Sequence, residues 1–190
     1  MHPGGVRVTK SPLRRATWWI VGALLALFLA WLVFVFLVII HPQTSDPPRK
    51  ADAIVVLGPA LGRRLNEAIG IAANLGIDQV LVSVGDEGTR SPLCTQPQHG
   101  ITLTCFIPHP YTTQGEAREL RKVAAQRHWT NVIVYADMPH LSRAHMLFKR
   151  CFGGNIQMVP ERSGPSIGRW LYEFGYQTAA YVKAELQRGC

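Results

Sequence analysis

An uncharged apolar stretch of 25 residues, 16–40, places the strongest constraint on how this chain can fold. As an α-helix it would be about 37 Å long, which exceeds the ~30 Å hydrocarbon core of a bilayer. Trp18 and Trp19 near its start, and Trp31 further along, are of the residue type that favours membrane interfaces. A cleaved signal peptide would have an apolar region of about 7–15 residues and an A-x-A-like cleavage site. The stretch has neither feature, so the sequence predicts a transmembrane signal anchor.

The charges on either side of this stretch predict its orientation. Residues 1–15 carry four basic residues and no acidic one, whereas the proline-rich linker over residues 41–50 carries two basic residues and one acidic residue. Basic residues are retained on the cytoplasmic side of a membrane, so the basic tail is expected in the cytoplasm. We therefore expect a single-pass protein of the cell membrane, with residues 51–190 forming an extracytoplasmic domain.

The formal net charge of +8 is divided between the tail and the domain. The tail holds four of the 20 basic residues, which leaves residues 41–190, the linker and the domain together, with 16 basic and 12 acidic residues. This modest excess of +4 suits anionic lipid head groups or phosphorylated envelope intermediates as partners. No basic stripe interleaved with aromatic residues occurs, which argues against a nucleic-acid partner.

All four cysteines, Cys94, Cys105, Cys151 and Cys190, lie in the predicted extracytoplasmic domain. An oxidising compartment favours disulfides, and four cysteines allow three connectivities. We expect a bridge between Cys94 and Cys105, because they flank one loop that contains Pro, Gly and Thr. A bridge between Cys151 and Cys190 is then possible by elimination. No C-x-x-C spacing supports zinc, and no metal site is predicted.

Short apolar runs alternate with helical patterns along residues 51–190. Strands are expected at residues 53–57, 80–84, 101–107, 132–134 and 156–159. Helices are expected at residues 64–75, 113–127, 141–151 and 167–188. The last helix is expected to turn six residues toward the core: Trp170, Leu171, Phe174, Thr178, Tyr181 and Leu186. The alternation predicts an α/β domain with a doubly wound, mostly parallel sheet, preceded by one transmembrane helix.

Four segments are expected to converge at one edge of this sheet, namely residues 58–64, 83–87, 112–116 and 137–143. Small turns, helix N-termini and basic side chains suit an anionic group such as phosphate or carboxylate. The predicted substrate-binding residues are Gly58, Arg64, Ser83, Gly85, Thr113, Glu116 and Arg143.

His140 is the candidate general acid or base, because the pKa of a histidine is naturally close to the working pH. Asp137 would orient the imidazole or activate water. The structural alternative is that Asp137 caps the following helix, while His140 and Arg143 form its exposed first turn. By the same reasoning, Thr112 or Thr113 can cap its helix, and Glu116 would complete a capping box with Thr113.

Several motifs recur in a fixed order: ADAIVVLG (residues 51–58), RL-x-x-A (64–68), Ser83-x-Gly85, TTQGEA (112–117) and H-x-x-RA (140–144). This ordered set resembles the YdcF/SanA/ElyC-like family of bacterial envelope-associated proteins and covers nearly all of residues 51–160. The resemblance implies a Rossmann-like α/β domain, often with an N-terminal membrane anchor. It further implies a role in envelope integrity, lipid-carrier metabolism or peptidoglycan assembly, and one member is tied to binding S-adenosylmethionine. No reaction or cofactor is assigned to this chain.

We therefore expect a membrane-anchored envelope protein that binds or processes an anionic, phosphate-bearing or lipid-linked cell-envelope precursor. The alternative is a non-catalytic ligand-binding or scaffold module for envelope assembly. The sequence does not decide between an enzyme and a binding module.

Overall fold

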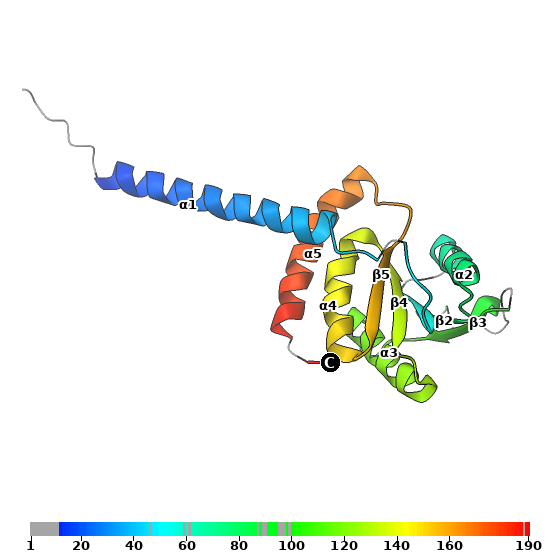
Figure 1. Ribbon diagram of the computed structural model, residues 1–190. Coiled ribbons are helices and arrows are strands. Elements are labelled where there is room, and N and C mark those ends of the chain that lie inside the picture. The colour runs from blue at the N-terminus through cyan, green and yellow to red at the C-terminus, as the bar shows by residue number, and fades with distance from the viewer. Residues whose placement is uncertain are drawn as a thin grey trace, which may run out of the picture.

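Five parallel strands form the centre of the domain in a computed structural model (Figure 1). The structure describes residues 12–45, 47–58, 60, 62–86, 88, 91–94, 98, 100–187 and 189–190. The strands are β1 (Ala53–Val56), β2 (Gln79–Ser83), β3 (Thr102–Phe106), β4 (Asn131–Ala136) and β5 (Asn155–Pro160). Their order across the sheet is β3-β2-β1-β4-β5, and every pair is parallel. The predicted α/β class is confirmed, with strand bounds within two residues of those expected.

The order of the strands places a topological switch point between β1 and β4. β1 pairs with β2 on one side and with β4 on the other, so the chain runs outward in both directions from this central strand. In such sheets ligands bind in the crevice beyond the carboxyl ends of the strands, where the order reverses. A ligand site is therefore expected beside the residues that follow β1 and β4.

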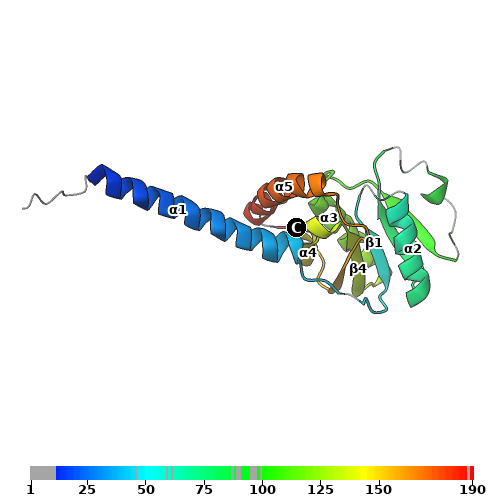
Figure 2. The ribbon, with the colours of Figure 1, turned by 90° about the horizontal axis from the view of Figure 1, so that it is seen from above.

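Helices cover both faces of the sheet. α2 (Arg63–Leu75) packs Leu65, Ala68 and Ala72 on one face, whereas α3 (Thr113–Arg127) and α4 (Leu141–Cys151) pack on the other. Every strand residue of β1 is buried, because both faces are covered. The view from above separates α2 from α3 and α4 (Figure 2).

A long N-terminal helix precedes the domain. α1 (Pro12–Phe34) continues without a break into a π-helical segment, η1 (Val35–Ile40). The span Arg14–Ile40 is long and apolar enough to cross a membrane, as the sequence predicts for residues 16–40. Its orientation stays a prediction, and residues 1–11 of the basic tail lie outside the described part of the chain.

The end of this helix is packed against the domain. Trp31 Nε1 donates to Thr178 Oγ1 at 3.2 Å, and the rings of Phe34 and Tyr181 meet edge to face at 5.5 Å between centroids. Val35 and Ile39 are buried, with 4% and 2% of their surface exposed. The last turns of the helix are therefore part of the domain.

The inward face of the C-terminal helix differs from the prediction. In α5 (Ile167–Leu186), Leu171 and Leu186 are 71% and 78% exposed, so the expectation that they face the core is wrong. The buried residues of this helix are Glu173, Gln177 and Ala184. The physical reason is that the inner face of α5 meets a polar cluster, described below, and hydrogen-bonds to it.

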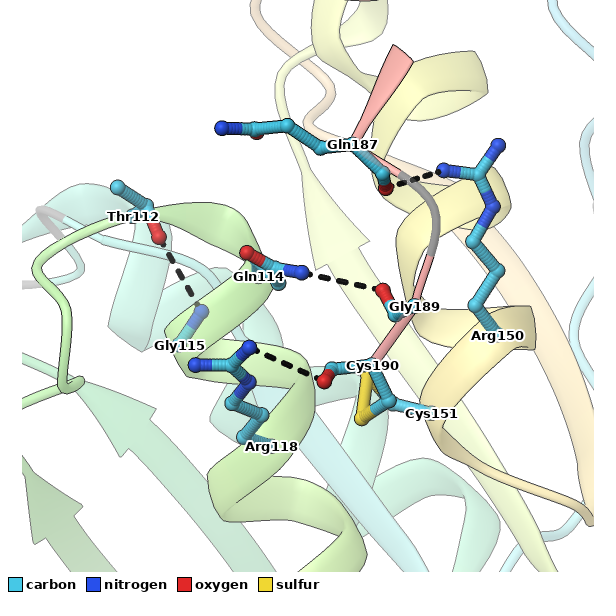
Figure 3. Close-up of a disulfide and its surroundings, with 9 residues drawn as sticks. All are labelled: Thr112, Gln114, Gly115, Arg118, Arg150, Cys151, Gln187, Gly189 and Cys190. Atoms are coloured by element: carbon cyan, nitrogen blue, oxygen red, sulfur yellow. Dashed lines mark hydrogen bonds between the residues drawn. A yellow bond between two sulfur atoms is a disulfide. The ribbon is translucent and has the colours of Figure 1, made fainter. Parts of the chain in front are cut away.

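Two disulfides are present, the expected one and the one left by elimination. Cys94 is bonded to Cys105, as predicted, and Cys151 is bonded to Cys190. The second bridge fastens the chain after α5 to the end of α4 (Figure 3). Hydrogen bonds from Gln114 to the Gly189 carbonyl and from Arg118 to the Cys190 carbonyl, each 3.0 Å long, attach the same segment to α3.

The proline-rich segment over residues 41–50 lies along the domain surface. The Ser45 N–H donates to the Met158 carbonyl at 2.8 Å, and the Arg49 N–H donates to the Gln157 side chain at 2.7 Å. These bonds place the segment beside β5, so the link between α1 and β1 is fastened to the sheet. Asp46 lies outside the described residues.

Candidate functional site

The residues predicted to bind a substrate gather at the carboxyl edge of the sheet in three connected groups. Gly58, Ser83 and Glu116 form the first group, and Arg64 with Asp137 forms the second. Thr113, His140 and Arg143 form the third group. Gly85 stands apart: a Cβ built on it would lie 3.5 Å from the Tyr111 hydroxyl. Glu87, which ends one of the predicted segments, lies outside the described residues.

The first group closes the turn after β1. The Gly58 N–H donates to Glu116 Oε1 at 2.8 Å, and the Ser83 hydroxyl also hydrogen-bonds to this carboxyl. A Cβ at Gly58 would lie 3.0 Å from Ser83 Oγ, so the close approach of the two turns favours glycine. Burial raises the pKa of Glu116, although the bonds from Gly58 and Ser83 and the charge of Arg143 oppose the rise.

These contacts correct the predicted capping box. Thr112 is the N-cap of α3, and its hydroxyl oxygen accepts from the Gly115 N–H at 3.2 Å. Glu116 instead reaches across to the turn after β1. Glu116 therefore joins two elements of the site, which a residue that only caps its own helix would not do.

The second group is an arginine held between two carboxyl groups. Arg64, near the start of α2, pairs with Asp137 after β4 and donates through Nε to Glu161 after β5 at 3.1 Å. Its Nη1 donates to the carbonyl of Leu57 at 3.1 Å. The guanidinium thus bridges the ends of β1, β4 and β5, so it fixes the geometry of the switch point.

Asp137 and Glu161 titrate as a pair. Burial raises the pKa of Asp137, and its hydrogen bond to Glu161 raises it further despite the charge of Arg64. Burial also acts to raise the pKa of Glu161, but the hydrogen bonds from Asp137, Ser163 and Arg64 outweigh it and lower that pKa to about 2. Asp137 is therefore the member of the pair that takes up a proton first. Its side chain makes no cap bond to the helix that follows, so the alternative of a capping Asp137 is wrong.

The third group centres on the Thr113 hydroxyl. Thr113 Oγ1 lies 3.1 Å from His140 Nε2 and accepts a hydrogen bond of 3.2 Å from Arg143 Nη1. Burial lowers the pKa of His140 well below its usual value, and the charges of Arg143 and Arg64 act in the same direction. His140 is therefore neutral near pH 7 and can accept or donate one proton. The alternative of an exposed first turn does not fit, because both side chains are tied to Thr113.

A row of polar residues on α5 continues from this group. Arg143 Nε donates to Gln177 Oε1 at 3.0 Å, Gln177 donates to Glu173 at 2.9 Å, and Arg169 donates to Glu173 at 2.6 Å. Burial lowers the pKa of the Arg143 guanidinium, against the opposing charges of Tyr176, Glu116 and Glu173. The inner face of α5 thereby forms one wall of the site.

Three residues of this site are absent from the sequence-based prediction: Glu161, Glu173 and Gln177. A signal exists for Glu161, because it directly follows β5 just as Asp137 directly follows β4. Glu173 and Gln177 are four residues apart, which places them on one helix face, but the prediction assigns the inner face of α5 to apolar residues. Among the residues that the structure describes, no group of three or more His, Cys, Asp or Glu side chains is placed to hold a metal ion.

A hollow of about 650 Å³ lies at the opposite, amino-terminal edge of the sheet, with Asp52 and Trp129 in its lining. There the Asp52 carboxylate accepts from the backbone N–H groups of Thr130 and Asn131, at 2.7 and 2.9 Å. These bonds lower the pKa of Asp52 and satisfy the start of β4, so this carboxylate has a structural role. The hollow is therefore separate from the candidate site.

No known protein family, curated protein or solved structure matches this chain. The resemblance to the YdcF/SanA/ElyC-like family therefore stays a prediction carried by the ordered motifs.

Proposed function

We propose that this chain is a membrane-anchored envelope protein that binds or processes an anionic, phosphate-bearing or lipid-linked precursor at the switch point. The observation that carries the proposal is the set of hydrogen bonds that Arg143 makes. Both hydrogen bonds that it makes to described side chains go to uncharged acceptors, Thr113 and Gln177. Arg64, in contrast, already pairs with Asp137 and Glu161. A half-buried guanidinium without a hydrogen-bonded carboxylate, beside the N-terminus of α3, suits an incoming anion.

The same group supports a chemical role for His140. A neutral imidazole that carries its proton on Nδ1 accepts the Thr113 hydroxyl proton at Nε2. Hydroxyl and imidazole within hydrogen-bond reach form the pair from which nucleophilic or general-base catalysis starts. His140 would then act as the acid or base, and Arg143 would stabilise negative charge on the ligand. Asp137 would act through its pairing with Glu161 and Arg64.

A non-catalytic binding or scaffold module is the second candidate, and one contact favours it. The Gly58 N–H, which a phosphate would otherwise use at the turn after β1, is already bonded to Glu116. A site whose polar groups satisfy one another can hold a ligand or partner without turnover.

Two features support an extracytoplasmic domain. The basic bias before α1 favours a cytoplasmic N-terminus. Both cysteine pairs are bonded, which fits an oxidising compartment. A reporter that is active only outside the cytoplasm, fused after Cys190, should therefore be active. An active cytoplasmic reporter at that position would contradict the orientation.

The experiment that tests the site compares Arg143→Ala and Arg143→Lys in the full-length protein in detergent. Binding of inorganic phosphate and of a polyisoprenyl phosphate would be measured by calorimetry. Loss of a charge-assisted contact worth about 1.5–3 kcal/mol corresponds to a loss of affinity of about 10- to 150-fold for Arg143→Ala. Arg143→Lys should recover only part of it, since an ammonium group lacks the planar fork.

The matched control is Arg121→Ala, which removes a solvent-exposed arginine from α3. It should leave affinity unchanged. Melting temperatures of all variants would be recorded, because Arg143 also binds Thr113 and Gln177 and its loss will cost some stability. Equal affinity in folded Arg143→Ala and wild-type protein would exclude this arginine as the anion-binding group.

A further inference from the structure

The outer face of α5 carries a continuous line of exposed, uncharged residues. We define the α5 apolar stripe as Ile167, Leu171, Gly175, Ala179, Val182 and Leu186. They recur at steps of three or four residues, so they share one side of the helix. Ile167, Leu171 and Leu186 are 85%, 71% and 78% exposed. Large apolar side chains gathered in this way on a surface mark a contact site.

The stripe lies beside the end of the candidate membrane helix. α5 contacts α1 through Thr178 with Trp31 and through Tyr181 with Phe34. In both views α5 runs across the end of α1, on the side of the domain from which α1 projects (Figures 1 and 2). An apolar groove of about 630 Å³ between the two helices is lined by Trp31 together with Gly175, Ala179, Val182 and Leu186. The stripe and the exposed surface of α1 are therefore continuous.

The length of α1 sets the level of the bilayer surface. About 20 helical residues cross a ~30 Å hydrocarbon core, so a span that begins at Ala16 leaves the core near Val35. One face of the helix becomes covered by the domain at that level. Val35 and Ile39 are buried, whereas Phe36 and Leu37 on the other face stay 52% and 58% exposed. The contacts with α5, at Trp31 and Phe34, thus fall at the level where the helix leaves the lipid.

We propose that α5 lies in the interface of the same bilayer, with the α5 apolar stripe turned into the lipid. The inference rests on the membrane anchoring of α1 proposed above. An interfacial helix has one apolar face and one polar face and lies across the membrane normal. In α5 the polar face holds Glu173 and Gln177, and Tyr172 stacks on Tyr176 beside the stripe, as aromatic residues do at membrane surfaces.

The position of the stripe favours lipid over a second copy of the chain. The stripe shares its apolar groove with Trp31 of α1, so a bilayer that surrounds α1 would also reach the stripe. A second domain docked there would have to displace that lipid. The bilayer covers the stripe without any further partner.

This arrangement specifies the ligand class of the candidate site. Arg143 hydrogen-bonds to the inner face of α5 through Gln177, while the outer face of the same helix carries the stripe. One helix diameter, about 10–12 Å, therefore separates the site from the lipid. A ligand anchored in the bilayer can place its anionic head group at Arg143, so a lipid-linked precursor fits better than a freely soluble one.

The experiment measures the depth of single labels in the full-length protein in vesicles of phosphatidylcholine and phosphatidylglycerol. The four native cysteines are bonded in pairs, so one introduced cysteine can be labelled with the fluorophore NBD. Leu171→Cys and Val182→Cys test the stripe, and both positions are exposed, so folding should not suffer. Ala125→Cys, on the exposed side of α3, is the aqueous control, and Leu25→Cys within α1 is the deep control.

Labels at 171 and 182 should be quenched by lipids carrying a shallow nitroxide, and their quenching by iodide should be several-fold weaker than at 125. If iodide quenches the labels at positions 171 and 182 as strongly as the label at 125, while the label at 25 is protected from iodide, the proposal for α5 alone is overturned. Strong iodide quenching at 25 would overturn the anchoring itself. Protection of 171 and 182 that disappears in nanodiscs holding one chain would assign the stripe to a second copy and would also overturn the proposal.

Discussion

The hydroxyl oxygen of Thr113 and Nε2 of His140 lie 3.1 Å apart and join the N-terminus of α3 to the turn before α4. Arg143 donates to the same hydroxyl oxygen, so the threonine proton remains available for a hydrogen bond to His140. Nε2 accepts that bond in the neutral tautomer that carries its proton on Nδ1. The burial that lowers the pKa of His140 favours the neutral imidazole, so the hydrogen bonds and the charge state agree.

The first prediction is an acid-sensitive stability that depends on His140. The folded protein keeps this imidazole neutral, whereas the unfolded chain protonates it below a pKa of about 6.5. Below that pH the unfolded state binds more protons, so the free energy of unfolding should fall by up to about 1.4 kcal/mol for each pH unit. Above pH 6.5 the contribution is fully present. Urea unfolding of wild-type protein from pH 5 to pH 7.5 measures the slope.

His140→Gln supplies the comparison, because glutamine can bond to Thr113 but does not titrate. The slope of the free energy of unfolding against pH should flatten in this variant. Burial also lowers the pKa of half-buried His145, and its smaller contribution to the slope stays in both proteins. Identical pH dependence in wild type and His140→Gln would show that His140 is not held neutral by the fold.

The second prediction contrasts two adjacent arginines on the same carboxylate. Arg64 and Arg63 both reach Glu161, but their side chains are 14% and 69% exposed. Arg64→Gln leaves two partly buried carboxyl groups without their shared cation and should lower the free energy of unfolding by about 3 kcal/mol. Arg63→Gln should cost less than about 1 kcal/mol, since solvent screens an exposed pair.

The pH dependence of the Arg64→Gln effect tests its cause. The folded-state pKa of Glu161 is lowered to about 2, so its contribution is present above the unfolded value of about 4.5 and is lost as pH falls toward 2. The difference between wild type and Arg64→Gln should therefore be smaller at pH 3 than at pH 6. Chemical denaturation of the full-length protein in detergent gives both values, and a constant difference would point to lost packing instead.

The third prediction concerns the link between α3 and the turn after β1. Glu116→Ala removes the acceptor of the Gly58 N–H and of the Ser83 hydroxyl, which should cost about 1–3 kcal/mol. Glu116→Gln keeps an acceptor oxygen, and burial already disfavours the charge, so it should cost less than Glu116→Ala. The control is Glu119→Ala, whose carboxylate pairs only with the exposed Lys122 among the described residues. Thermal unfolding ranks the three variants, and equal losses at 116 and 119 would refute a linking role.

The fold was predictable because its signals are local. The uncharged run of residues 16–40 and the apolar strands each specify an element by composition, and the alternation of strands and helices implies a parallel sheet. The convergence of the predicted site residues followed from the same rule, since the carboxyl ends of parallel strands share one edge. The contacts that these side chains make with one another at that edge were not predictable. Glu116 could have capped its own helix, and only the tertiary structure shows that it bonds to Gly58.

The error in α5 has a physical cause as well. Its apolar residues follow a helical period, and in a water-soluble domain that period indicates the core-facing side. Here Leu171 and Leu186 lie on the outer side, because Glu173 and Gln177 occupy the inner face to meet Arg143. The other predicted residues, Trp170, Phe174, Thr178 and Tyr181, are half-buried. Periodicity reveals that a helix is amphipathic, but it does not reveal which medium lies on either side.

The fourth prediction compares the two disulfides. The Cys94 and Cys105 pair closes a loop with a sequence separation of 11, and the Cys151 and Cys190 pair closes one of 39. Chain-entropy arguments give about 3 kcal/mol for the shorter loop and about 4 kcal/mol for the longer one. The longer loop also contains α5, so its bridge keeps the inner face of that helix against Arg143.

Replacing both cysteines of a pair by serine should therefore lower the melting temperature more for Cys151 and Cys190. Ligand affinity should fall for that pair, and it should be nearly unchanged for Cys94 and Cys105, whose loop lies beside β2 and β3. Calorimetric unfolding and phosphate binding of the two double variants measure both effects. A larger loss of affinity from the Cys94 and Cys105 pair would show that the loop between β2 and β3, rather than α5, shapes the site.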